Sequence, residues 1–199
     1  PIEHHNIIGR MACREDVMNE WKDDYLFDGI LLNPIDLNKF YPKQTQNEKY
    51  TILSLSTLDD LRFNMLIDLI IRCANNDYKL VICGKDHINF KEKVKTMFTG
   101  LDFVEFKDET NTPEEELAKC DEIAGIYEGR VSLEGIAMGK RASIYDLDGS
   151  HYMLEDYDIK KHDYKLIAET IVNKFKSLLQ ENTVDIVVVR YGKKEMEDK

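Results

Sequence analysis

One segment of the sequence has a pattern that binds anions: a glycine-bearing turn between an apolar run and a helix. Residues 123–127 are apolar and strand-like, residues 128–132 form a polar turn that includes Gly129, and residues 133–138 are predicted to be helical. Gly129 permits a tight backbone, and the first N–H groups of a helix have no acceptor within it. These groups and the helix dipole attract negative charge. We therefore expect an anionic ligand at the backbone amides of Val131, Ser132 and Leu133.

Three charged side chains accompany this turn and helix, namely Glu128, Arg130 and Glu134. Arg130 could stabilise a negatively charged leaving group such as a diphosphate. Glu134 lies in the first turn of the predicted helix, where a carboxylate is favourable even without a ligand. Capping of the helix is therefore the alternative explanation of Glu134.

Strands and helices alternate along the chain. Strands are predicted at residues 50–56, 79–83, 101–106, 123–127 and 142–145, and helices at 15–21, 57–76, 91–98, 113–119, 133–138 and 164–179. This order predicts an α/β fold, a Rossmann-like parallel sheet with helices on both faces. The buried face of helix 57–76 is predicted to contain Phe63, Leu66, Ile67, Ile70, Ile71 and Ala74. Residues 151–158 are aromatic and acidic and are predicted to be a surface loop.

The candidate site residues all follow predicted strands. Ligands of open α/β sheets bind outside the carboxyl ends of the strands. Three strands of this sequence are followed there by Thr57 and Arg62, by Gly84 and Lys85, and by the segment from Glu128 to Glu134. This convergence predicts a single site at one edge of the sheet.

The string EGRVSLEGIAMGKRASIYD at residues 128–146 resembles the donor-binding signature of GT-B glycosyltransferases, E-G-x-G-x-x-x-x-E-A-M-A-x-G-x-P-V. The second half of the signature matches at Glu134, Ala137, Met138 and Gly139. The first half departs from it, because the family has two glutamates eight positions apart, whereas Glu128 and Glu134 are six apart. The turn at Gly129 and Arg130 is similar to a G-R-x-x-L-E variant of the same superfamily.

The resemblance implies a nucleotide-sugar donor and a role for each residue. Glu134 would contact the ribose, Glu128 would act on the donor sugar, and the nucleobase would lie near residues 107–111. The family's G-R-L-x-x-x-K segment grips the diphosphate with two cations. Here Thr57 replaces the arginine and Arg62 takes the lysine position. Arg130 could supply the missing charge. The family also implies transfer with retention. No metal or other cofactor is expected if Arg62 and Arg130 supply the positive charge.

A second resemblance concerns the organisation of the chain. Residues 29–43 are similar to the family's interdomain linker, with matches at Asn33, Pro34, Ile35, Asp36, Phe40 and Pro42. This predicts a lead-in and linker at 1–43, following a missing acceptor-binding domain, and a donor-binding domain at 44–182. Residues 183–199 would be a tail, either the start of a further domain or an edge strand at 184–189. We therefore expect the chain alone to bind a donor but to transfer nothing.

Composition restricts the class of protein. The net charge of −11 argues against a nucleic-acid partner. No apolar run approaches the roughly 20 residues of a membrane span, and there is no signal peptide. The four cysteines are scattered and are expected to be reduced thiols, which suggests a cytoplasmic protein. The chain begins with Pro1, which suggests a fragment. The partners implied are a nucleotide-sugar and, through the missing domain, a glycan or lipid-linked acceptor.

Other functions stay open. A non-catalytic nucleotide-binding or scaffold module is favoured by the lost arginine and the altered glutamate spacing. A GT-B-like sugar-nucleotide epimerase would have the same half-fold. A nicotinamide enzyme is disfavoured, because no G-x-G-x-x-G follows any predicted strand. Metal binding is not expected, although His4 and His5 are adjacent and Asp146 and Asp148 have D-x-D spacing.

Overall fold

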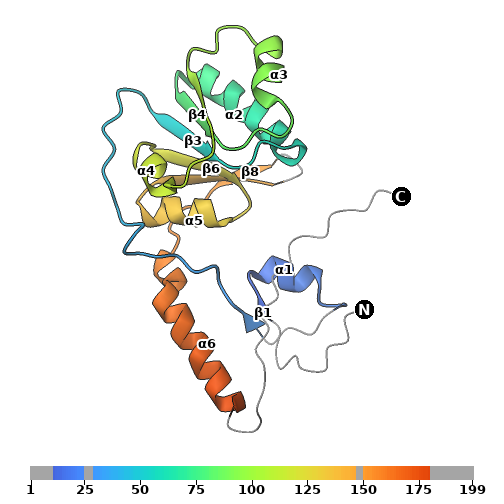
Figure 1. Ribbon diagram of the computed structural model, residues 1–199, viewed down its shortest axis with the longest axis vertical. Coiled ribbons are helices and arrows are strands. Elements are labelled where there is room, and N and C mark those ends of the chain that lie inside the picture. The colour runs from blue at the N-terminus through green and yellow to red at the C-terminus, as the bar shows by residue number, and fades with distance from the viewer. Residues whose placement is uncertain (1–10, 25–28, 147–149, 180–199) are drawn as a thin grey trace. The chain divides into compact units, whose positions relative to one another are not determined.

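The structure is a computed structural model that describes residues 11–24, 29–146 and 150–179 (Figure 1). The chain forms two compact units. One unit is residues 35–159, and the other combines the described residues up to Pro34 with those from Lys160 onward. Three features discussed above lie outside the described residues: the strand predicted at 184–189, the adjacent His4 and His5, and Asp148 of the D-x-D spacing.

A six-stranded sheet forms the centre of the unit at residues 35–159. Its five parallel strands are joined at one edge by an antiparallel sixth strand. The spatial order is β5 (Val104–Lys107), β4 (Lys79–Cys83), β3 (Thr51–Leu55), β6 (Glu122–Ile126), β7 (Arg141–Tyr145) and β8 (His151–Met153). The predicted α/β fold is confirmed. The prediction that residues 151–158 form only a loop is wrong, because β8 pairs with β7 through the register Ile144 to Tyr152.

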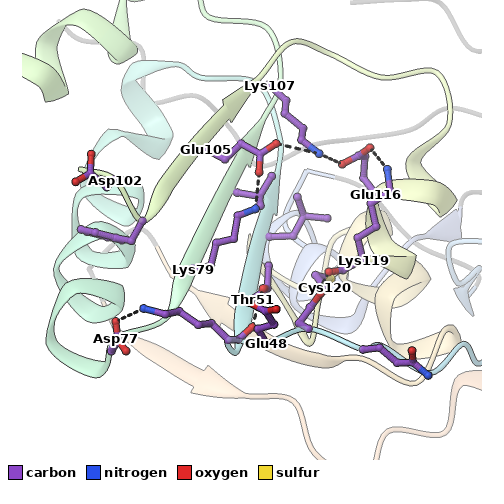
Figure 2. A pocket seen from close by; sticks show the side chains of 16 residues that line it. Glu48, Thr51, Asp77, Lys79, Asp102, Glu105, Lys107, Glu116, Lys119 and Cys120 are labelled. Carbon is purple, nitrogen blue, oxygen red and sulfur yellow. Dashed lines mark hydrogen bonds and ion pairs between the residues drawn. The ribbon is translucent and has the colours of Figure 1, made fainter. Parts of the chain in front are cut away.

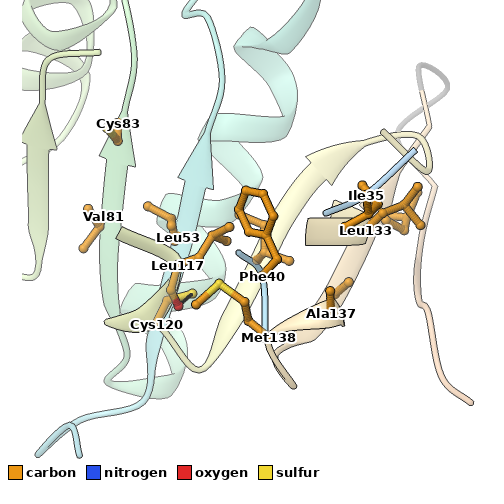
Figure 3. Packing of buried hydrophobic residues seen from close by; sticks show 13 residues of the cluster. Ile35, Phe40, Leu53, Val81, Cys83, Leu117, Cys120, Leu133, Ala137 and Met138 are labelled. Atoms are coloured by element: carbon orange, nitrogen blue, oxygen red, sulfur yellow. Dashed lines mark hydrogen bonds between the residues drawn. The ribbon is translucent and has the colours of Figure 1, made fainter. Parts of the chain in front are cut away.

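Side chains alternate between the two faces of the sheet, and helices cover both faces. Leu53, Val81 and Ile123 point to one face, where they pack with residues of α4 (Pro113–Ala118) and α5 (Arg130–Ala137) (Figure 3). The opposite face packs against α2 (Phe63–Asn76) and α3 (Phe90–Met97), and its residues include Ile52, Leu80, Ile82, Leu66 and Val94. The two-residue period of a strand explains this division. We call these the α4–α5 face and the α2–α3 face.

Helix α2 starts later than predicted and buries a different stripe. Residues 57–59 are a loop, a 3₁₀ turn follows at Asp60–Arg62, and the helix begins at Phe63. Its buried residues are Met65, Leu66, Leu69, Ile70 and Cys73. Ile71 and Ala74, predicted on the buried face, are exposed. The apolar residues of this helix cover more than one stripe, so periodicity alone did not identify the stripe that packs on the sheet.

Helix α3 is capped by a side chain that lies before its formal start. Asn89 precedes the helix with a left-handed backbone and makes no side-chain cap. The carboxylate of Asp86 replaces it and accepts hydrogen bonds from the backbone N–H groups of Ile88, Phe90 and Lys91. These bonds satisfy donors that a helix start otherwise leaves without acceptors.

Replacing Asp86 with Ala is expected to lower the free energy of unfolding by about 1–2 kcal/mol, the usual cost of a lost cap. Burial disfavours the charged carboxylate, but the backbone hydrogen bonds outweigh burial and hold the pKa of Asp86 below its ordinary value. A lowered folded-state pKa stabilises the protein above the unfolded-state pKa, and this contribution is lost as pH falls through the folded-state value. Urea unfolding should therefore show a difference between wild type and Asp86→Ala that shrinks below about pH 4. Asp102→Ala, at an exposed aspartate, is the control, and a pH-independent difference would contradict the capping role.

The second unit contains short elements and one long helix. Strands β1 (Met11–Ala12) and β2 (Gly29–Ile30) pair in parallel, and α1 spans Glu15–Glu20. A 3₁₀ turn at Ile159–His162 leads into α6 (Tyr164–Leu179). The helices predicted at 15–21 and 164–179 are thus confirmed. On α6, Ile167 is buried, whereas Leu166 and Val172 are about half exposed. None of the helices in the described ranges is long and apolar enough to cross a membrane.

The strand order changes direction between β3 and β6. From β3 the chain continues outward to β4 and β5, then returns to place β6 on the other side of β3. The loops that leave β3 and β6 therefore run in opposite directions. Such a switch in direction is where open α/β sheets bind ligands.

Candidate functional site

The edge of the sheet at the carboxyl ends of β3 and β6 has two sides. One side is the loop after β3, at residues 56–59, together with the loop after β4 that contains Gly84 and Lys85. The other side is the loop after β6, at residues 127–129, and the start of α5. Each predicted site residue lies on one of these segments or on the first turns that follow them.

The loops after β3 and β4 are held together by their backbones. A Cβ atom on Gly84 would lie 1.8 Å from the carbonyl oxygen of Ser56, so only glycine allows this approach. Backbone bonds join Ser56 N to Cys83 O (3.0 Å), Leu58 N to Lys85 O (2.9 Å) and His87 N to Leu58 O (3.0 Å). The side chains of Thr57 and Lys85 are exposed on this double loop. Within the described residues the structure gives the Lys85 ammonium no carboxylate partner.

Arg62 lies at the end of the 3₁₀ turn that precedes α2, and its guanidinium is paired with Asp59. Asp59 has two roles, because its Oδ1 also accepts the backbone N–H of Arg62 at 3.1 Å. Both side chains are about one-third exposed. The sequence reasoning missed Asp59, although an aspartate three residues before an arginine is a common capping arrangement.

Helix α5 begins at Arg130, three residues before the predicted start, and Gly129 is its N-cap. The predicted turn at 128–132 is therefore wrong in its second half. The N–H of Leu133 donates to the carbonyl of Gly129 at 3.2 Å and is not available to a ligand. The amides without an acceptor inside the helix are those of Arg130, Val131 and Ser132. The side chains of Ser132 and Leu133 are buried, so a ligand could meet Ser132 only through its backbone N–H.

The backbone just before this helix is unusual. Tyr127 has a φ of 55°, a left-handed conformation that is rare for a residue with a large side chain. The N–H of Gly129 donates to the carbonyl of Tyr127 at 2.7 Å, which holds the turn closed. This tight turn connects the end of β6 to the first turn of α5. Strained residues of this kind are concentrated at functional sites.

Glu134 is the buried carboxylate of the site. Its side chain is 4% exposed, and Oε1 accepts a hydrogen bond from Nε of Arg130 at 2.8 Å. Among the described residues nothing contacts Oε2 within hydrogen-bond distance. Burial raises the pKa of Glu134, and Arg130 opposes this effect. Lys39 and Glu114, which form an ion pair of 3.0 Å, are close enough to influence the same pKa.

Glu128 points along the edge of the sheet toward β8. Its Oε1 accepts a hydrogen bond from the hydroxyl of Tyr152 at 3.3 Å. Burial, and next the Glu128 charge, raise the pKa of Tyr157 to about 12. The described contacts therefore tie Glu128 to β8 and its following loop, whereas Arg62 is tied to the loop after β3. Sequence reasoning missed Tyr152 because residues 151–158 were predicted to be a loop.

A cavity near the sheet lies elsewhere. It has a volume of about 760 Å³ and lies on the α4–α5 face over β3, β4 and β5, toward the amino ends of the strands (Figure 2). Its lysines are already paired, as Lys49 with Asp77, Lys79 with Glu105, and Lys107 and Lys119 with Glu116. Paired lysines offer little net positive charge to a phosphate. In the described ranges no group of three metal-ligating side chains is found at any place.

The chain matches no protein-family model and no curated protein sequence. Solved structures are similar to it in fold. The glycosyltransferase AviGT4, involved in avilamycin A biosynthesis, is 12% identical with a TM-score of 0.62, and the match covers 92% of this chain and 69% of that one. HepE from Anabaena in complex with UDP and glucose is 15% identical with a TM-score of 0.54, over 68% of this chain and 43% of HepE.

A third similar structure is TarM of S. aureus in complex with fondaparinux, α-GlcNAc-glycerol and UDP. It is 16% identical with a TM-score of 0.58, over 87% of this chain and 42% of TarM. At such identities the likeness shows the fold alone. The Rossmann-like fold of GT-B glycosyltransferases, predicted from the sequence, is confirmed. The chain spans less than half the length of HepE and of TarM.

Proposed function

We propose that the unit at residues 35–159 is the donor-binding domain of a glycosyltransferase and binds a nucleoside-diphosphate sugar, with UDP as the best-supported nucleotide. Two similar structures are complexes with UDP, which supports this choice of nucleotide. The acceptor would be held by another domain. Transfer would need no metal and would proceed with retention, and the protein would act in the cytoplasm.

The buried carboxylate of Glu134 carries the proposal. The Glu134 side chain is 4% exposed, and its Oε2 has no hydrogen-bond partner among the described residues, so this oxygen is an acceptor that a ligand could use. Beside it, the first three amides of α5 have no acceptor within the helix. A ribose hydroxyl at Oε2 of Glu134 and a phosphate at the amides of Arg130, Val131 and Ser132 would satisfy both groups. A nucleoside diphosphate contains both chemical groups.

The remaining predicted residues would act on the departing diphosphate. In the reaction, the bond between the sugar anomeric carbon and the diphosphate oxygen breaks, and its electron pair stays on the diphosphate. The acceptor hydroxyl oxygen bonds to the anomeric carbon, and its proton passes to a base on the domain that holds the acceptor. Helix amides and cations that are already in place stabilise the growing charge. Arg62, Lys85 and the hydroxyl of Thr57 would supply these contacts from the loops after β3 and β4, and Glu128 would face the sugar.

Replacing Glu134 with Gln is expected to weaken UDP binding about tenfold or more, because a hydrogen bond to a charged group contributes about 1.5–3 kcal/mol. Isothermal titration calorimetry of wild type and variant with UDP measures this. Gln has nearly the same shape as Glu, so a large change in folding is not expected. The control is Glu92→Gln, which removes an exposed carboxylate of α3 that pairs with Lys95. Equal UDP affinity of wild type and Glu134→Gln would contradict the proposed site.

A scaffold module is the second candidate, and one observation favours it. Both guanidiniums expected to meet the diphosphate are paired with carboxylates, Arg62 with Asp59 and Arg130 with Glu134. A phosphate would have to compete with these internal anions. Calorimetry with UDP, GDP and ADP separates the two functions, since a scaffold would bind none of them.

A further inference from the structure

The two side chains of the ion pair between Arg130 and Glu134 differ strongly in burial. The side chain of Arg130 is 69% exposed and that of Glu134 is 4% exposed. The contact is a single hydrogen bond from Nε to Oε1, at 2.8 Å. The two terminal nitrogens of the guanidinium have no described partner. The pair is therefore a surface cation held at the entrance of a buried anion.

The position of this pair in the helix does not serve helix stability. Arg130 is the first residue of α5, where the helix dipole disfavours a cation, and the acidic residue follows it four positions later. This is the reverse of the favourable order, in which the acidic residue precedes the basic one. Because this pair opposes the helix dipole, its effect on the position of the Glu134 side chain explains it better than helix stability does.

The hydrogen bond restricts how Glu134 can point. With Oε1 held by Arg130, Oε2 is the carboxylate oxygen without a hydrogen-bond partner among the described residues. The Glu134 side chain is 4% exposed, so its surroundings restrict its movement. Arg130 and burial together leave Oε2 as the acceptor available to a ligand.

We propose that Arg130 is a positioning residue, which holds Oε1 of Glu134 so that Oε2 accepts a hydrogen bond from a ribose hydroxyl of the bound nucleotide. This inference rests on the proposed function. It differs from the role predicted from the sequence, in which Arg130 grips the diphosphate directly. If Arg130 positions Glu134, its loss weakens recognition of the ribose. If Arg130 grips the diphosphate, its loss weakens binding of the phosphates.

The test compares UDP with its 2′-deoxy and 3′-deoxy analogues on wild type and Arg130→Met. Wild type should prefer UDP over at least one analogue about tenfold or more, the usual penalty for removing a hydroxyl from a site that hydrogen-bonds it. In Arg130→Met the ratio of the UDP affinity to the affinity for that deoxy analogue should fall toward one, while the affinity for the analogue itself changes little. If Arg130→Met weakens UDP and both analogues equally and keeps the preference, the arginine acts on the phosphates and the inference is overturned. Lys95→Met, which removes an exposed cation of α3, is the control.

A second measurement does not need a ligand. Because Arg130 opposes the effect of burial, its loss should raise the pKa of Glu134, which carboxyl ¹³C NMR can follow in the free protein. An unchanged Glu134 titration in Arg130→Met overturns the inference even if UDP binds. Conversely, failure of wild type to bind UDP, combined with a raised Glu134 pKa in Arg130→Met, would reject the proposed function and leave the positioning contact supported.

Discussion

Gly84→Ala is expected to lower the free energy of unfolding by more than about 3 kcal/mol and to abolish UDP binding. The added methyl group would lie 1.8 Å from the carbonyl oxygen of Ser56 and 2.7 Å from its carbonyl carbon. Both are backbone atoms, so rotation of a side chain cannot relieve the overlap. The loops after β3 and β4 would have to separate, and the bonds that join Leu58 to Lys85 and to His87 would be lost.

The matched control is Gly100→Ala. Gly100 also has a positive φ, of 71°, but an added Cβ atom would meet no atom within 4 Å. Its replacement should cost only the left-handed strain of about 1–2 kcal/mol. Urea unfolding gives both free energies, and calorimetry gives the UDP affinity at a temperature where each variant is folded. Similar losses in the two variants would show that backbone conformation, rather than the contact with Ser56, requires glycine at position 84.

The sequence predicts most of the sheet because buried strands have a distinctive composition. Residues 80–83 are apolar on both faces, and the structure places Leu80 and Ile82 on one face and Val81 and Cys83 on the other. Strand β8 could not be predicted in this way. It is short, polar and exposed at the edge, and its existence depends on pairing with β7, which is a tertiary contact.

The sequence predicted where the candidate residues lie in the fold, but not their contacts. The strand order alone brings the segments after β3, β4 and β6 to one edge, so the location of Thr57, Lys85 and Glu134 follows from the fold class. The internal pairing of Arg62 with Asp59 does not, because it depends on the 3₁₀ turn that replaces the first predicted turn of helix 57–76. Likewise, Gly129 was interpreted as the middle of a turn, whereas its extended backbone makes it a helix N-cap.

The other prediction with a large expected effect concerns a buried ion pair at the amino ends of the parallel strands. Glu122 at the start of β6 is fully buried and receives two hydrogen bonds from Arg72 of α2, at 2.7 and 3.0 Å. The Tyr50 hydroxyl donates a third, at 2.9 Å. Burial and the Glu122 charge raise the pKa of Tyr50, which keeps this hydroxyl protonated as a donor. The pair therefore joins α2 to the centre of the sheet.

Replacing Arg72 with Met is expected to lower the free energy of unfolding by about 3–5 kcal/mol, because the Glu122 carboxylate stays buried without its cation. Glu122→Leu should cost less, since the Arg72 side chain is 25% exposed and its guanidinium can reach water. The double variant should regain most of the loss, because two apolar side chains of similar volume replace the pair. Urea unfolding of all four proteins gives the coupling energy.

The exposed pair of Lys95 and Glu92 provides the comparison, and its removal should change stability by less than about 1 kcal/mol. An Arg72→Met variant no less stable than Lys95→Met would mean that water or a rearranged side chain compensates Glu122, and that this pair does not hold α2 on the sheet.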